Sequence, residues 1–219
     1  MIKTITVKGS GHACVKPDLI VLYVRLVTED KDYEKTTEIA GEKINALNES
    51  FEKAGFEKQA VKTTDFNVST RYESVKDKNG AYKSVFKGYV CNHNLKTEFD
   101  FDMKKLAKAL SAILECLAKP EFSVSFTVKD KDAVNAELLK SATKNAKEKA
   151  EVICSASGVK LGDLVSVEYV FGDKNAYSDT DFTVESRCMA KAEACLSDIA
   201  IEPDDVKVDD TVKFVWEIS

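Results

Sequence analysis

The sequence predicts an α+β fold: a mixed or antiparallel sheet with three main helices and a long protruding β-hairpin. Hydrophobic residues make up 44% of the 219 residues, which is enough to form a core and too many for a disordered chain. Strand-like and helix-like patterns alternate without a Pro- or Gly-rich linker, and Asn79-Gly80 separates two long alternating segments. We therefore expect a single domain over residues 1–219, with its strands and helices sharing one core.

Two strands are expected in the N-terminal segment. Residues 2–8 alternate between apolar and polar side chains, and Gly9-Ser10-Gly11 then indicates a turn or bulge. Lys16-Pro17 is a second break, because the residue before a proline avoids the helical conformation. The run from Leu19 to Thr28 is dense in β-branched and aliphatic residues, which favours a strand in the middle of a sheet.

Three helices are expected, and each follows an aspartate that can cap its first turn. Their ranges are about 32–54, with Asp30 or Asp32 as the cap, then 103–118, with Asp102, and about 131–157, with Asp130 or Asp132. Apolar or small residues recur every third or fourth position, which predicts one inward stripe per helix. The stripes are Tyr33, Thr36, Ala40, Ile44, Leu47, Phe51 and Ala54; Leu106, Ala109, Leu110, Ile113, Leu114 and Leu117; and Leu139, Ala142, Ala146, Ala150 and Ile153. Because the third stripe is mostly alanine, its helix can approach a sheet closely.

A long hairpin is expected from residues 60–73 and 81–99, joined by Asn79-Gly80. If these two residues form the turn, Lys78 faces Ala81, and the later pairs place Val68 opposite Cys91. Period two then predicts a shared face of Phe66, Val68, Tyr89, Cys91, His93, Leu95 and Phe99.

The hairpin arm, about residues 66–93, is a candidate interaction surface. A two-stranded ribbon of this length is only marginally stable alone, and tyrosine is enriched at protein interfaces. We therefore predict that the arm packs on a second copy of the chain, with the interface residues Tyr72, Val75, Tyr82, Val85, Phe86 and Tyr89. An alternative is an adaptor that binds another protein at the hairpin edge by strand addition.

The C-terminal part is expected to contain strands at 122–128, 163–170 and 212–218. The last of these carries Phe214 and Trp216, which we expect in the core. Between the second and third lies an irregular insertion, about residues 171–200, with one short helix near 188–196.

Charge and composition narrow the function classes. The net charge is −5 and the lysines are spread over helix faces, which weighs against a nucleic-acid partner. No stretch approaches the ~20 apolar residues of a transmembrane helix. Met1 leads directly into a strand pattern and the six cysteines are scattered, so a cytoplasmic location is expected. A periplasmic or secreted location would follow if a signal peptide has been removed.

Few residues point to catalysis. Cys91 and His93 could share a metal, but no second spaced pair of ligands is nearby, and a packed thiol beside a hydrogen-bonded histidine is the simpler interpretation. Gly9-Ser10-Gly11 lacks the third glycine of a phosphate-binding loop. We therefore expect no catalytic residues, no cofactor and no metal. A thiol-based redox protein or sensor is the alternative, with Cys14 and Cys188 as reactive thiols because each has a nearby cation and an expected loop setting.

Taken in order, several segments resemble the SIMPL-domain family, a family of unknown function that includes oxidative-stress-defence and periplasmic immunogenic proteins. The similar segments are Ile5-Thr6-Val7-Lys8-Gly9-Ser10-Gly11, Pro17-Asp18, Lys62-Thr63-Thr64 with Phe66, Tyr72, Gly88-Tyr89, Phe126, Ala142 with Asn145-Ala146 and Lys149-Ala150, Gly158, Leu161-Gly162, and a closing strand after Pro203. The resemblance implies an α+β domain that forms large ring- or channel-like homo-oligomers, possesses no established catalytic residue and takes part in oxidative-stress protection. The chain departs from its relatives in the absent signal-peptide pattern and in the 171–200 insertion.

Overall fold

A computed structural model describes residues 3–76, 80–170, 176–184 and 202–219, and these form an α+β fold as expected. The elements are β1 (Lys3–Val15), β2 (Leu19–Asp30), α1 (Tyr33–Lys53), β3 (Lys62–Lys76), β4 (Tyr82–Asp100), α2 (Met103–Glu115), β5 (Glu121–Thr127), α3 (Lys131–Ser157), β6 (Leu161–Glu168), β7 (Tyr177–Val184) and β8 (Val206–Ile218). One sheet has the order β1-β8-β6 and the other the order β3-β4-β2-β5-β7. The pairs β1–β8, β6–β8, β2–β4 and β3–β4 are antiparallel.

The chain divides into two compact units. Unit 1 comprises Met1–Asp18, Phe126–Thr180 and Pro203–Ser219, and therefore holds the three-stranded sheet and α3. Unit 2 comprises Leu19–Ser125 and Asp181–Glu202, and holds α1, α2 and most of the five-stranded sheet. In the described residues, no helix is long and apolar enough to cross a membrane.

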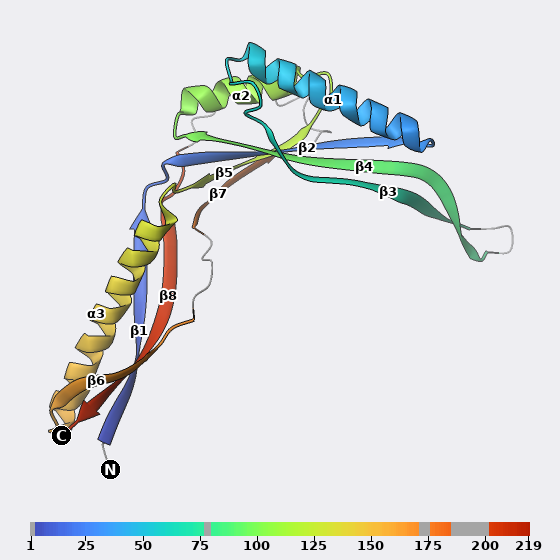
Figure 1. The fold of residues 1–219 in the computed structure, drawn as a ribbon. Coiled ribbons are helices and arrows are strands. Elements are labelled where there is room, and N and C mark those ends of the chain that lie inside the picture. The colour runs from blue at the N-terminus through green and yellow to red at the C-terminus, as the bar shows by residue number, and fades with distance from the viewer. Residues whose placement is uncertain (1–2, 77–79, 171–175, 185–201) are drawn as a thin grey trace. The chain divides into compact units, whose positions relative to one another are not determined.

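Unit 2 is built around β2, which lies in the middle of its sheet as the β-branched run predicted. The helices α1 and α2 cover one face of this sheet (Figure 1). Asp32 and Asp102 cap them as expected, each accepting hydrogen bonds from two backbone N–H groups of the first turn. After α1, Gly55 adopts a positive φ of 90° and the Phe56 N–H donates to the Phe51 carbonyl.

The inward stripes of α1 and α2 are right in their centres and wrong at one end of each. Tyr33, expected inside, is 52% exposed, because it begins α1 beside the hairpin. The second helix ends at Glu115 instead of residue 118, so Leu117 leaves the helix and is 93% exposed. The predicted core positions between these ends, Ala40, Leu47, Phe51, Leu106, Ala109, Leu110 and Ile113, are buried.

In unit 1, α3 lies along β1 and β8 (Figure 1). The turn or bulge expected at Gly9-Ser10-Gly11 is wrong, because β1 continues through these residues to Val15. The glycines instead allow close packing: a Cβ at Gly9 would lie 2.0 Å from the Ala142 carbonyl oxygen, and one at Gly11 2.2 Å from that of Leu138. The small-residue stripe of α3 therefore packs against the glycines of β1, which is the close approach to a sheet that its alanines predicted.

The buried row of α3 has a strict spacing of four. It consists of Val134, Leu138, Ala142, Ala146, Ala150 and Cys154. Leu139 and Ile153 were predicted to point inward, but Leu139 is half-buried and Ile153 is 47% exposed. Phe214 and Trp216 are buried against the alanines, with their rings stacked 5.3 Å apart, which confirms their expected place in the core.

The segment expected as an irregular insertion contains a strand. β7 spans Tyr177–Val184 and lies at the edge of the five-stranded sheet, and the Thr127 hydroxyl donates to the Ala176 carbonyl just before it. The polar composition of this segment concealed the strand, because an edge strand with one solvated face needs few apolar residues. The short helix expected near 188–196, and Cys188 with it, lies outside the described residues.

The predicted hairpin register is confirmed from Asp65 opposite Asn94 to Arg71 opposite Gly88, and it is off by one residue beyond both ends of this stretch. Val68 pairs with Cys91 and Phe66 with His93, as the turn at Asn79-Gly80 predicted. Beyond Arg71 the register shifts by one residue, so that Lys76 faces Tyr82 instead of Lys83. The shift coincides with Gly88, whose φ of 136° few other residues adopt and which packs directly against the Asp30 carbonyl.

Candidate functional site

The hairpin arm carries a continuous row of aromatic rings in unit 2. Tyr33 of α1 contacts Tyr89 at a centroid distance of 5.5 Å, Tyr89 contacts Phe86 at 5.4 Å, and Phe86 contacts Tyr72 at 5.6 Å, all edge to face. Such pairs are worth about 0.5–1.5 kcal/mol beyond burial alone, so the row stiffens the ribbon. Tyr72 and Phe86 are nevertheless 57% and 44% exposed.

The tip of the arm, residues 72–86, extends beyond the rest of its sheet. Pairing of β2 with β4 ends at Asp30 opposite Tyr89, so the tip consists of β3 and β4 alone (Figure 1). The predicted interface residues are all placed there or at its base: Tyr72, Val75, Tyr82, Val85 and Phe86 are exposed, and Tyr89 is half-buried. Val75 and Val85 lie on the face opposite the aromatic row, so both faces of the ribbon present apolar surface.

Ion pairs fix the base of the arm. The Arg71 guanidinium donates to the carboxylates of Glu29 and Glu73, and the Lys87 ammonium lies 3.2 Å from Glu73. The hydrogen bond from Lys87, with further help from Arg71, lowers the pKa of the Glu73 carboxyl. Because these groups are solvent-exposed, the pairs orient the arm more than they stabilise the fold.

His93 and Cys91 lie under the base of the arm, on the buried face of β4. The His93 ring is edge to face with Phe66 at 5.0 Å, and its Nε2 is 2.8 Å from the Thr63 hydroxyl. Burial lowers the pKa of His93 and raises the pKa of the fully buried Cys91 thiol. This is the packed thiol beside a hydrogen-bonded histidine that the sequence favoured over a metal pair.

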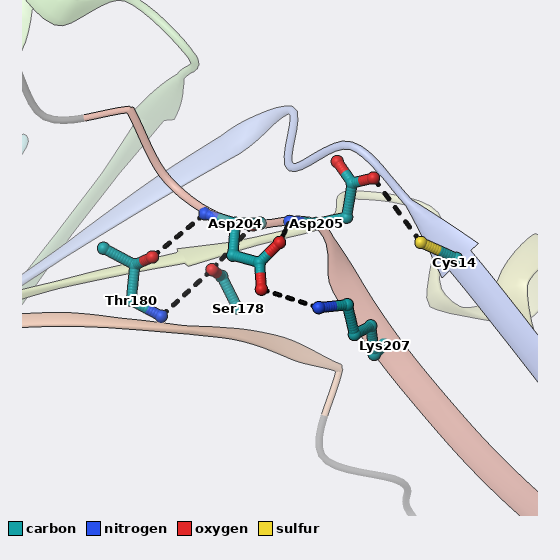
Figure 2. A network of polar contacts seen from close by, with 6 residues as sticks. All are labelled: Cys14, Ser178, Thr180, Asp204, Asp205 and Lys207. Atoms are coloured by element: carbon teal, nitrogen blue, oxygen red, sulfur yellow. Dashed lines mark hydrogen bonds and ion pairs between the residues drawn. The ribbon is translucent and has the colours of Figure 1, made fainter.

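Cys14 belongs to a polar network in unit 1 (Figure 2). Its thiol donates to the Asp205 carboxylate, with Sγ and Oδ2 3.5 Å apart. The neighbouring Asp204 accepts a hydrogen bond from Lys207 at 2.6 Å, and its backbone groups bond to the hydroxyls of two β7 residues, Ser178 and Thr180. The network fastens the start of β8 to β7, a role that sequence reasoning missed because these residues are far apart in the chain.

The surroundings of Cys14 do not activate its thiol. The hydrogen bond to Asp205 is the largest of the effects that raise the pKa of Cys14, and the charge of the same carboxylate adds to it. Less of the exposed thiol is therefore ionised at neutral pH. The expected loop setting is wrong, because Cys14 lies within β1. A hollow of about 430 Å³ beside it is lined by two aspartates with structural roles: Asp18 accepts from the Lys129 N–H and Asp130 caps α3.

The outer edge of β1 is closed by polar side chains of α3. The Ser10 N–H donates to the Asn145 side-chain oxygen at 3.0 Å, the His12 N–H donates to the Ser141 hydroxyl at 3.2 Å, and the Lys149 ammonium donates to the Lys8 carbonyl at 3.3 Å. Ser141, Asn145 and Lys149 are spaced by four and lie next to the buried alanines. In each such pair, for example Asn145-Ala146, the alanine packs on β1 and the polar residue forms a hydrogen bond with a free backbone group of β1.

Metal-ligating groups do not converge in the part of the chain that the structure describes, where no three His, Cys, Asp or Glu side chains are placed to hold an ion. His12 lies outside any such set and pairs with the exposed Asp209 across β1 and β8.

A second hollow, of about 410 Å³, lies in unit 2 beside Arg25, whose guanidinium donates to Asn92 at 2.7 Å and lies 3.8 Å from Glu121.

Comparison with known proteins agrees with the resemblance in the sequence. The 26 kDa periplasmic immunogenic proteins of Brucella melitensis biotype 1 and Brucella abortus (strain S19) are 24% and 23% identical over 163 residues. In each case the match covers 74% of this chain and 65% of the relative, so the chain spans less than two thirds of these relatives. The model of SIMPL, a protein family of unknown function (DUF541), matches residues 5–216. Because this match takes in nearly the whole sequence, the chain belongs to the SIMPL family.

Proposed function

We propose that this protein is a non-enzymatic, self-assembling SIMPL-family protein and that the arm is its assembly element. The observation that carries the proposal is the arm tip, a two-stranded ribbon with apolar side chains exposed on both faces. Exposed contiguous apolar surface of this kind marks interaction sites in soluble proteins. The aromatic row and the ion pairs at the base hold the ribbon in one conformation, which lowers the entropy lost on binding.

The arm offers enough apolar surface to drive association. Full burial of a large apolar side chain contributes roughly 1.5–3 kcal/mol, and association costs roughly 4–15 kcal/mol in lost freedom of movement. A single tyrosine cannot overcome that cost. Because five of the six predicted side chains are 38–72% exposed and Tyr89 is already half-buried, the set can overcome a cost toward the lower end of this range when it is buried together. The proposal therefore requires that most of the tip is buried together and not one anchor alone.

The test is to shorten the arm and measure the mass. Replacing Tyr72–Phe86 by Asn-Gly leaves Asn-Gly-Lys87 as a three-residue connection between the paired Arg71 and Gly88. Light scattering behind size exclusion, with reductant present, should show that the wild type is a discrete assembly and that the shortened variant is smaller. Leu117→Ser, which removes an exposed aliphatic side chain outside the arm, is the matched control and should leave the mass unchanged.

Two results would contradict the proposal. One is a monomeric wild type at all concentrations measured. The other is an unchanged elution volume for the shortened variant, which would mean that the assembly uses other surfaces. Because Trp216 is buried in unit 1 and the arm belongs to unit 2, a thermal melt followed by circular dichroism, together with the emission of Trp216, shows whether both units of the variant retain their fold.

The redox alternative loses support at Cys14, whose pKa is raised, and retains Cys188, which the structure does not describe. Timed thiol titration under peroxide separates the two functions: one fast-reacting cysteine favours a redox protein, and uniformly slow reaction favours the assembly protein. The adaptor alternative predicts that a pull-down returns another protein bound to the arm. The cytoplasmic location and the link to oxidative stress stay predictions, and the relatives carry the word periplasmic in their names.

A further inference from the structure

Among the residues that the structure describes, the three-stranded sheet of unit 1 has one closed edge and one open edge. At β1 the free backbone groups bond to Ser141, Asn145 and Lys149 of α3. At the other edge, β6 pairs with β8 and with no further strand in the described part of the chain. Proteins ordinarily protect such an edge with charged residues, lysine above all, with proline, with a bulge or with a covering element. Residues 161–170 contain neither lysine nor proline, and their protection is limited to two acids and two shifts of register.

The side chains of the β6 edge are aliphatic and exposed. Leu164, Val165 and Val167 are each about half exposed, at 52%, 53% and 47%, and Val170 just after the strand is 87% exposed. Two shifts in the pairing of β6 with β8 fall between Leu161 and Ser166. These shifts interrupt the regular backbone of the edge. A partner therefore binds through contacts with the aliphatic side chains more than through a long ladder of backbone hydrogen bonds.

The charge on this edge is opposite to that on the arm. Residues 161–170 carry two acids, Asp163 and Glu168, and no base; Glu168 forms an ion pair with Lys213. Residues 70–88 of the arm carry five basic and two acidic residues in a protein whose net charge is −5. Two β6 edges facing each other, or two arms, would bring like charges together, whereas an arm on a β6 edge brings opposite charges together.

We infer that the β6 edge of one copy, Leu161–Val170, is the surface that receives the arm tip of another copy. The inference rests on the proposed function, because it names the receiving partner of the same arm. The aromatic row and the two valines of the tip cover the β6 aliphatic side chains, and the lysines of the tip lie toward Asp163 and Glu168. The contact joins two different surfaces, so each copy donates one arm and receives one.

The experiment uses two variants that each lack one surface. Val165→Lys with Val167→Lys blocks β6 and removes its negative charge, while the arm-shortened chain retains an intact β6. Val165→Ser with Val167→Ser is the milder alternative should the lysines disturb folding, and Leu117→Lys is the control for an added exposed charge. Because β6 pairs with the residues around Trp216, its emission reports whether β6 is in place.

Each single-surface variant should be monomeric by light scattering, with assembly weakened at least about tenfold, the effect expected of central interface residues. An equimolar mixture should form a heterodimer close to twice the 24.2 kDa chain mass, because only one arm and one complementary β6 remain. A mixture that stays monomeric refutes the head-to-tail contact. A folded β6 variant that assembles like the wild type refutes the inference and leaves the proposed function standing, whereas a monomeric wild type refutes both.

Discussion

Replacing Gly9 by alanine tests the closest contact in unit 1. A Cβ there would lie 2.0 Å from the Ala142 carbonyl oxygen and 2.6 Å from the Ala146 Cβ, so β1 and α3 would have to move apart. Overpacking of this kind costs roughly 1–3 kcal/mol, and backbone atoms on both sides place this site at the upper end. Alanine recovers up to about 1 kcal/mol through lower chain entropy in the unfolded state, so the expected net loss is about 2 kcal/mol.

A loss of this size lowers the melting temperature by about 4–8 °C in a chain of 219 residues. The measurement is thermal unfolding followed by the emission of Trp216, the single tryptophan, which belongs to the same buried cluster as Ala142 and Ala146. Gly41→Ala is the control, because a Cβ there has nothing within 4 Å and lies inside α1, where alanine gains about 1 kcal/mol. A melting temperature for Gly9→Ala equal to that of the wild type would refute the close packing of α3 on β1.

Three further predictions concern single contacts. Asp205→Asn should speed alkylation of Cys14 at pH 8, because the carboxylate that raises the pKa of the thiol is lost; an unchanged rate would contradict that cause. Burial lowers the pKa of His93, so its contribution to stability is present above pH ~6.5 and is lost as pH falls toward the lowered pKa. His93→Gln should therefore flatten the fall in melting temperature between pH 7 and 5, and an equally steep fall would exclude His93 as its source. Asn145→Ala should cost about 1 kcal/mol and speed hydrogen exchange at the Ser10 amide, whereas an unchanged exchange rate would show that the edge is closed by other groups.

Features set by neighbouring residues could be predicted from the sequence. Asp32, Asp102 and Asp130 cap helices because a carboxylate there meets free N–H groups within three residues of itself. The pairing of Val68 with Cys91 matches the register predicted from Asn79-Gly80, although a one-residue shift beyond Arg71 separates this pairing from the turn. Five of the six interface candidates are exposed, because no other part of the described chain covers a ribbon that extends past its sheet, whereas Tyr89 at the base is half-buried.

Features set by distant segments could not be predicted in this way. Judged from their neighbours in the sequence, Gly9 and Gly11 indicate a turn. They lie in a strand, and glycine is needed there because α3, more than 120 residues later, approaches closely. The same approach selects Leu138 over Leu139 for burial, because both continue the alanine stripe and only one lies over Gly11. The open edge at β6 was missed for a similar reason, since the pattern of residues 163–170 predicts a strand but not its place in the sheet.

The two unpartnered surfaces have a consequence for the form of the assembly. If an arm binds a β6 edge, a pair of copies joined by one such contact still has one free arm and one free edge. Addition then continues until the rotation between successive copies closes a ring, or without limit as a filament. A ring gives one discrete mass that does not change with concentration, and a filament gives a mass that grows with concentration. The concentration series of the light-scattering experiment therefore determines the symmetry of the assembly as well as its existence.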